Sequence, residues 1–219
     1  TLIIIGSAIE CIHSYSLIHD DLPSMDNDDF GRGKQTVHKK WNEAIAILAG
    51  DGLQTFAFQT LANSKTHLNA NRRLLLISSL AEAAGIHGMV GGQTLDIEAE
   101  KSQKDLSIES IKKLQELKTG ALIVWSALVG PRLAKKSIKP LTTYAEALGL
   151  AFQIKDDILD ATGDPNILGK KTKKDASAGK ATFVSSLGLD EANAKAKRSA
   201  KANRKRSAKS NRYIESDWV

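Results

Sequence analysis

The 219-residue sequence has few cysteines, prolines and aromatic residues, and it lacks a long apolar run. Cys11 is the only cysteine, so no intrachain disulfide can form, and a reducing, cytoplasmic environment is expected. The longest strongly apolar stretch, Ala121 to Val129, is much shorter than a membrane span. We therefore expect no membrane span, and the apolar segment Thr1 to Ile5 lacks the basic leader of a signal peptide.

The positive net charge comes from one segment near the C-terminus. The chain has 31 lysine and arginine residues against 25 acidic ones, which gives a formal charge of +6. Nine of the basic residues lie between Lys195 and Arg212, where no acid occurs, so the remainder carries −3. Binding of an anionic polymer through this segment is an alternative function. Nucleic acid is not the expected partner, because no aromatics are interleaved for base stacking.

The pattern of apolar residues predicts an all-α protein with one domain over residues 1–190 and a basic tail over residues 191–219. Long stretches rich in Ala, Leu, Ile, Glu and Lys favour helices, and only four prolines interrupt them. The glycines at 85, 88, 91 and 92 indicate either close helix packing or a break beside a ligand. Helices are predicted over residues 2–22, 42–63, 70–99, 107–129, 141–162 and 188–210, with loops at 23–41, 64–69, 100–106, 130–140 and 163–187.

Two acidic clusters lie far apart in the sequence. The first is Asp20-Asp21-Leu22-Pro23-Ser24-Met25-Asp26-Asn27-Asp28-Asp29, and the second is Asp156-Asp157-Ile158-Leu159-Asp160. Carboxylates without a nearby Cys or His pair favour Mg²⁺ over zinc. The chain must bulge near Pro23 if Asp20 and Asp26 are to reach one metal, because six residues separate them. The first cluster alone would also fit a solvated acidic turn, but the two together favour a metal site.

Several basic segments would complement these acids. They are Gly31-Arg32-Gly33-Lys34-Gln35-Thr36, Lys118-Thr119-Gly120, Gly169-Lys170-Lys171-Thr172 and Gly179-Lys180-Ala181-Thr182. Glycine lets a backbone approach phosphate closely, lysine supplies charge and threonine supplies a donor. Each segment alone would fit a solvated surface, and none has the spacing of a Walker A loop. In combination with two acidic clusters they indicate a diphosphate bridged by Mg²⁺.

At these segments the sequence resembles the trans-isoprenyl diphosphate synthase family, most closely its bacterial farnesyl diphosphate synthase branch. Both aspartate-rich motifs match in order, as do the segments Gly88-Met89-Val90-Gly91-Gly92-Gln93 and Leu117-Lys118-Thr119-Gly120. The resemblance implies an isoprenoid-synthase helical bundle around a central cavity, with the family's N-terminal helices missing and usually a homodimer. It also implies a Mg²⁺-dependent prenyltransferase that condenses dimethylallyl or geranyl diphosphate with isopentenyl diphosphate to give farnesyl diphosphate.

The resemblance also implies roles for individual residues. Three Mg²⁺ ions, with Mn²⁺ as a possible substitute, would be held by Asp20, Asp21, Asp26, Asp156 and Asp160. Lys118 and Lys170 would neutralise the allylic diphosphate, and Thr119 and Gln153 would stabilise its developing cation. Lys180 would be a further substrate-binding residue. His13 and Arg32 would bind isopentenyl diphosphate. The implied catalytic set comprises Asp20, Asp21, Asp26, Lys118, Thr119, Gln153 and Asp156.

Two further positions bear on product and activity. Tyr15 precedes Asp20 by five residues, so its ring would limit the cavity and favour a C15 product, although it would also fit an ordinary core. Gly31 stands where the family has the first of two adjacent arginines, and Gln35 stands where it has proline. These departures leave open a second possibility, a degraded or non-catalytic partner subunit of the same fold.

Overall fold

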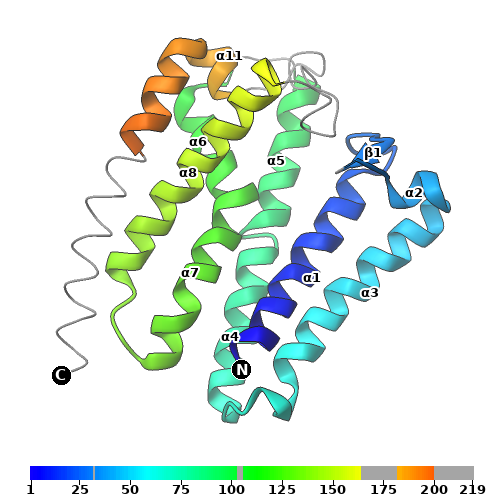
Figure 1. Ribbon diagram of the computed structural model, residues 1–219, viewed down its shortest axis with the longest axis vertical. Coiled ribbons are helices and arrows are strands. Elements are labelled where there is room, and N and C mark those ends of the chain that lie inside the picture. Colours follow the sequence, from blue (N-terminus) through cyan, green and yellow to red (C-terminus); the bar gives the residue numbers. More distant parts are fainter. Residues whose placement is uncertain (32, 103–105, 164–181, 200–219) are drawn as a thin grey trace. The chain divides into compact units, whose positions relative to one another are not determined.

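The computed structural model describes residues 1–31, 33–102, 106–163 and 182–199. Within these ranges the chain is almost entirely helical, which confirms the predicted all-α class (Figure 1). It divides into two compact units at Ala81 and Glu82, near the end of helix α4 (Ala70–Ala84). We refer to residues 1–81 as the first unit and to the described residues from 82 onward as the second unit.

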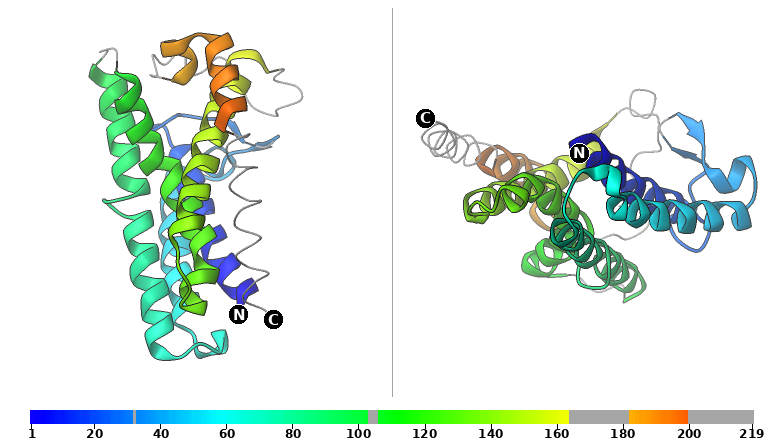
Figure 2. Two further views of the ribbon diagram at one scale, coloured as in Figure 1. Left: turned by 90° about the vertical axis from the view of Figure 1, so that its left-hand side faces the viewer. Right: turned by 90° about the horizontal axis from the view of Figure 1, so that it is seen from below.

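The first unit is built on two helices that lie side by side, α1 (Leu2–Asp20) and α3 (Glu43–Ala62) (Figures 1 and 2). Their shared core contains Ile5, Ala8 and Ile12 from α1. Between them run a short hairpin of β1 (Phe30–Gly31) and β2 (Lys34–Gln35), followed by α2 (Val37–Lys40). The 3₁₀ turn η1 (Ser64–Thr66) then leads to α4. The hairpin is too short to give a pattern of alternating residues, so the sequence did not predict it.

The second unit contains α5 (Met89–Ser102), α6 (Ile108–Gln115), the π-helical turn η2 (Glu116–Gly120), α7 (Ala121–Ala134) and α8 (Lys139–Thr162). After α8 the description resumes with α11 (Phe183–Leu187) and a helical segment over 189–199. One core cluster joins α6, α8 and α11 through Ile111, Ile154, Ile158 and Phe183. This packing fixes α8, which carries the second aspartate motif, against α11.

Several predicted helix boundaries are wrong, and glycine and backbone geometry explain them. The helix expected over 70–99 breaks after Ala84, where a Cβ on Gly88 would lie 2.0 Å from the Ala83 carbonyl oxygen. The helix expected over 107–129 contains the π-helical turn and continues through Pro131 to Ala134, into the predicted loop at 130–140. The loop expected over 163–187 ends in α11, and its residues 164–181 lie outside the described ranges.

Two stretches, Leu2–Asp20 and Ala70–Ser102, are long and apolar enough to cross a membrane, in contrast to the sequence expectation. Their most apolar windows are 22% and 28% buried. Core helices and signal sequences meet the same criterion of length and composition.

Candidate functional site

The first aspartate motif folds back onto the end of α1. Helix α1 ends at Asp20, because Pro23 cannot continue the helical hydrogen bonds. The Asp26 amide then donates to the Asp20 carbonyl oxygen at 2.9 Å, and the Asp28 amide donates to that of Asp21 at 3.1 Å. Asn27 adopts a left-handed conformation with φ of 50° between them. The bulge that the six-residue spacing required is present, and it brings Asp26 back to the end of α1.

Thr36 and His38 anchor the exit of this acidic loop. The Thr36 amide donates to the Asp29 carbonyl oxygen at 3.0 Å, and its hydroxyl donates to that of Asp28 at 2.7 Å. The buried His38 Nδ1 lies 3.1 Å from the same hydroxyl oxygen. Because the Thr36 proton is already used, His38 Nδ1 must be the donor. An ion pair of 2.8 Å between Lys39 and Asp29 closes the loop onto α2.

Tyr15 and His19 pack together on α1, close to the acidic loop. Tyr15 is buried, and its ring meets the His19 imidazole edge to face with centroids 5.7 Å apart. His19 Nε2 also lies 3.1 Å from the Ile47 carbonyl oxygen, and Gly50 leaves room for the ring. Burial raises the pKa of the Tyr15 phenol, the nearby Gln54 side chain lowers it, and the Asp20 charge raises it further. His13 lies two turns before Asp20 on α1.

In the second unit, Lys118 lies in the π-helical turn between α5 and α8. Its Nζ is 2.5 Å from Asp96 Oδ2 on α5, and the two side chains are 21% and 10% exposed. Helix α5 approaches closely because Gly92 has no side chain: a Cβ there would lie 2.2 Å from the Lys118 amide nitrogen. On the other side, a Cβ on Gly149 of α8 would lie 3.4 Å from Gly120 Cα. The absence of side chains at Gly92 and Gly149 thus lets α5 and α8 pack closely against the backbone of η2.

A chain of hydrogen bonds links the turn to the second aspartate motif. The Thr119 hydroxyl donates to Gln153 Oε1 at 3.2 Å, and Gln153 Nε2 donates to Asp157 Oδ1 at 3.0 Å. Asp157 Oδ2 accepts the Phe183 amide at 2.8 Å. Burial raises the pKa of Asp157, whereas the bonds from Gln153 and Phe183 lower it and the nearby Asp156 and Asp160 charges raise it.

Asp156 and Asp160 lie one helical turn apart on α8, as predicted. Asp156 is half-buried and Asp160 is buried. Among the described residues, no group of three or more His, Cys, Asp or Glu side chains is arranged to hold a metal by itself. The donor set still suits Mg²⁺, which is commonly held by one or two carboxylates together with substrate phosphates.

The structure therefore groups the predicted residues within each unit. In the first unit the acidic loop brings together Asp20, Asp21 and Asp26, with Tyr15 and His13 on the preceding helix turns. In the second unit Lys118, Thr119, Gln153, Asp156 and Asp160 come from η2 and α8. Arg32, Lys170 and Lys180 lie outside the described residues.

The sequence did not single out two residues that contact this second-unit group: Asp96, which pairs with Lys118, and Asp157, which bonds Gln153. Asp96 follows the glycine-rich segment at 88–93, and its position within that helix was the available signal. Asp157 lies inside the second motif, but adjacent aspartates in a sequence do not show which one is turned toward the core.

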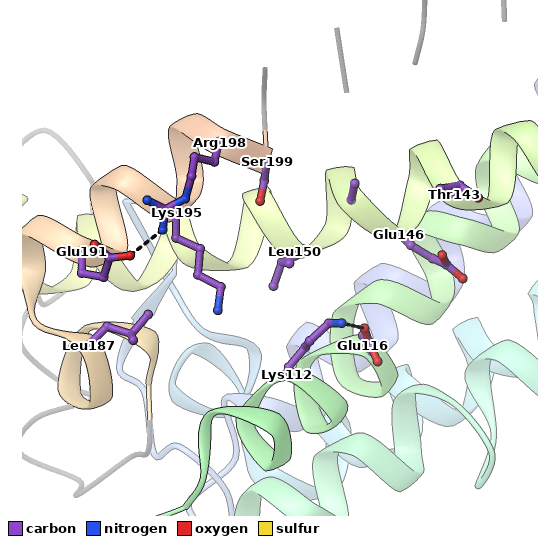
Figure 3. A pocket seen from close by; sticks show the side chains of 11 residues that line it. Lys112, Glu116, Thr143, Glu146, Leu150, Leu187, Glu191, Lys195, Arg198 and Ser199 are labelled. Carbon is purple, nitrogen blue, oxygen red and sulfur yellow. Dashed lines mark hydrogen bonds and ion pairs between the residues drawn. The ribbon is translucent and has the colours of Figure 1, made fainter. Parts of the chain in front are cut away.

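A separate pocket of about 550 Å³ lies in the second unit and contains none of the predicted site residues (Figure 3). Ion pairs join Lys112 to Glu116 and Arg198 to Glu191 along its wall. Its lining carries as many acids as bases, so it offers no surplus charge to a diphosphate. Its charged lining residues are Lys112, Glu116, Glu146, Glu191, Lys195 and Arg198.

The chain is similar in sequence to known proteins along most of its length. Farnesyl diphosphate synthase of Escherichia coli K12 is 47% identical over 197 residues, which cover 88% of this chain and 65% of that protein. The farnesyl diphosphate synthase of Geobacillus stearothermophilus is 48% identical over 196 residues, with shares of 87% and 65%. The chain thus spans just under two thirds of the length of these relatives.

Solved structures show the same fold. An apo FPP/GFPP synthase of Zymomonas mobilis is 44% identical, with a TM-score of 0.83 over 94% of this chain and 69% of that one. A geranyltransferase of Helicobacter pylori, complexed with magnesium and isoprenyl diphosphate, is 38% identical, with a TM-score of 0.85 over 93% and 66%. The sequence profile of the polyprenyl synthetase family matches residues 1–216, past the expected boundary at residue 190. The chain belongs to the polyprenyl synthetase family.

Proposed function

We propose that this chain is a prenyltransferase that condenses dimethylallyl or geranyl diphosphate with isopentenyl diphosphate, with farnesyl diphosphate as the product. The observation that carries the proposal is the second-unit group in which a lysine, a hydroxyl, an amide and two carboxylates come from η2 and α8. The names of the relatives, which are farnesyl diphosphate synthases and geranyltransferases, support it. A cytoplasmic homodimer is the assembly that we propose with this activity.

Mg²⁺ is the proposed cofactor, and three ions per site is the number we infer, with Mn²⁺ as a possible substitute. Asp20, Asp21, Asp26, Asp156 and Asp160 would hold these ions. The magnesium in the Helicobacter pylori geranyltransferase supports this choice of metal. When bound, Mg²⁺ would stabilise negative charge on the departing diphosphate.

The chain's own residues would act on the two ends of the breaking bond. Lys118, with Lys170 and Lys180, would bind the allylic diphosphate, so the C–O bond could break with its electron pair leaving on the diphosphate. The Gln153 carbonyl oxygen and the Thr119 hydroxyl oxygen would face the resulting cation. His13 and Arg32 would hold isopentenyl diphosphate while its alkene attacks C1. A proton would then leave the new cation for the released diphosphate.

A direct assay tests the proposal. The purified chain is incubated with Mg²⁺, geranyl diphosphate and labelled isopentenyl diphosphate, and the extracted product is identified by its chain length. We expect labelled farnesyl diphosphate, and we expect its loss in Asp20→Ala and in Asp156→Ala. Calorimetric titration with inorganic diphosphate, with and without Mg²⁺, measures binding independently of turnover.

The two measurements separate the open possibilities. Absence of elongation, with Mg²⁺-dependent diphosphate binding that disappears in the aspartate variants, would overturn catalysis and favour a non-catalytic partner subunit. Absence of both, with salt-sensitive binding of a polyanion, would favour the basic tail as the functional element.

A further inference from the structure

Asp157 is the most buried carboxylate of the second aspartate motif, with 4% of its surface exposed. Its two oxygens have different neighbours: Oδ1 accepts from Gln153 Nε2 at 3.0 Å, and Oδ2 accepts from the Phe183 amide at 2.8 Å. Phe183 itself is fully buried in the core cluster with Ile111 and Ile154. The Phe183 amide of α11 therefore holds the Asp157 carboxylate, and core packing of the Phe183 ring fixes the position of that amide.

The chemistry of these groups determines which way the Gln153 amide points. A carboxylate can only accept hydrogen bonds, so the nitrogen of the amide must face Asp157. The oxygen must then face the other way, toward Thr119, whose hydroxyl donates to it at 3.2 Å. A neutral amide next to Thr119 alone could adopt either orientation, because a hydroxyl both donates and accepts.

We propose that Asp157 is a positioning residue that fixes the Gln153 amide with its oxygen toward Thr119, in place of serving as a metal ligand. The catalytic consequence rests on the proposed function, since an allylic cation is stabilised by an oxygen and repelled by an N–H group. The Phe183 bond adds a second effect: it ties this orientation to the position of α11. Asp157 thus joins Thr119, Gln153 and α11 in one hydrogen-bonded unit.

The substitution Asp157→Asn tests the orientation without removing atoms from the core. The Asn oxygen can still accept the Phe183 amide, but its nitrogen must then face Gln153. Two N–H groups cannot bond each other, so the Gln153 amide turns and places its nitrogen toward Thr119. We expect kcat to fall by about 100-fold, with KM changed by less than about twofold, because substrate-binding groups are untouched.

Substituting both residues restores hydrogen bonds from residue 153 to residue 157 and to Thr119. In Gln153→Glu with Asp157→Asn, the Asn nitrogen donates to one Glu oxygen, and the other Glu oxygen accepts from Thr119. The double variant should recover at least about tenfold of the lost kcat relative to Asp157→Asn. The single variant Gln153→Glu brings two carboxylates to the 3.0 Å separation of the present hydrogen bond, and it should be less active than the double variant. Asp190→Asn, an exposed carboxylate of the same unit, is the control that should change neither kcat nor KM.

A spectroscopic measurement makes the test independent of turnover. Glutamine side chains are labelled with ¹⁵N, and the Gln153 amide resonance is identified by its absence in Gln153→Glu. We expect its N–H signals to move in Asp157→Asn and to stay in place in Asp190→Asn. Circular dichroism and urea unfolding confirm that each variant is folded.

The outcomes separate this inference from the proposed function. If the chain shows no elongation at all, the proposed function fails, and the amide resonances alone decide the orientation. An unchanged Gln153 resonance in Asp157→Asn overturns the inference. A changed resonance with wild-type kcat in an active chain also overturns it, because the orientation then has no catalytic effect. A lower kcat, an unchanged KM and recovery in the double variant support it.

Discussion

Lys118 Nζ lies 2.5 Å from the carboxylate of Asp96, and both side chains are largely withdrawn from water. The pair joins the π-helical turn η2 to α5, so the lysine proposed to bind diphosphate is already held by an acid of the same unit. An ammonium group has three donors, so this contact leaves others for a substrate. Asp96 thereby fixes the place of a charge that would otherwise move on a long side chain.

We predict that Lys118→Met lowers the free energy of unfolding by about 2–4 kcal/mol, because it leaves the Asp96 carboxylate buried without its cation. The further substitution Asp96→Leu should recover most of this loss. Urea unfolding of the two single variants and the double variant measures the coupling between the residues.

The matched control is Lys112→Met, which breaks the exposed pair with Glu116, where the side chains are 49% and 47% exposed. Its effect should stay below about 0.5 kcal/mol, since exposed pairs of this spacing contribute little. Equal losses in Lys112→Met and Lys118→Met would show that burial does not distinguish the two pairs.

Gly92→Ala should be strongly destabilising because the new Cβ would lie 2.2 Å from the Lys118 amide nitrogen and 2.5 Å from its Cα. Backbone atoms cannot move aside as the end of a side chain can, so α5 and η2 must separate. We expect a loss of about 2–3 kcal/mol in urea unfolding. Gly130→Ala is the control, because nothing lies within 4 Å of a Cβ there and alanine favours the helix. An unchanged free energy of unfolding in Gly92→Ala would contradict the close approach of α5 to η2.

The contrast between Gly88, Gly92 and Asp157 shows what the sequence could predict. The helical class and the two acidic motifs follow from apolar spacing and from charge that needs a cation. The sequence also marked the glycines at 85–92, but it could not decide between close packing and a break beside a ligand. The structure shows close packing at Gly92 and a helix break that contains Gly88. The π-helical turn and the inward Asp157 depend on contacts between α5, η2, α8 and α11, which no local pattern contains.

Gly31→Arg should raise activity. The residue does not need a positive φ, and a Cβ there would meet only Asp21 Oδ2, at 3.9 Å, which is ordinary contact. An arginine would therefore fit and add a bidentate donor for diphosphate beside the acidic loop. We expect kcat/KM to rise by about tenfold or more in the elongation assay. Gly33→Arg adds the same charge at φ of 76°, where a side chain is strained, and it should give no gain.

The Tyr15 phenol should make stability fall at high pH. Burial and the Asp20 charge raise its pKa above the ordinary value of 10.0. The unfolded chain therefore releases this proton first, and the free energy of unfolding decreases as the pH rises from about 10 through the folded-state pKa. Urea unfolding between pH 8 and 11 should show a smaller decrease in Tyr15→Phe. The same slope in both proteins would mean that Tyr15 does not contribute.

Tyr15→Ala should lengthen the product beyond farnesyl diphosphate. Tyr15 is buried on α1 five residues before Asp20, so a chain growing from a diphosphate at the acidic loop would meet its ring after a fixed number of carbons. Removing the ring opens space along the helix, and the product distribution from geranyl and isopentenyl diphosphates should shift to C20 and longer. Tyr15→Phe keeps the ring and should keep the C15 product. Because loss of a buried aromatic costs about 3–5 kcal/mol, Tyr15→Leu is assayed in parallel as a less destabilising variant. Unchanged C15 product from folded Tyr15→Ala and Tyr15→Leu would assign Tyr15 to the ordinary core.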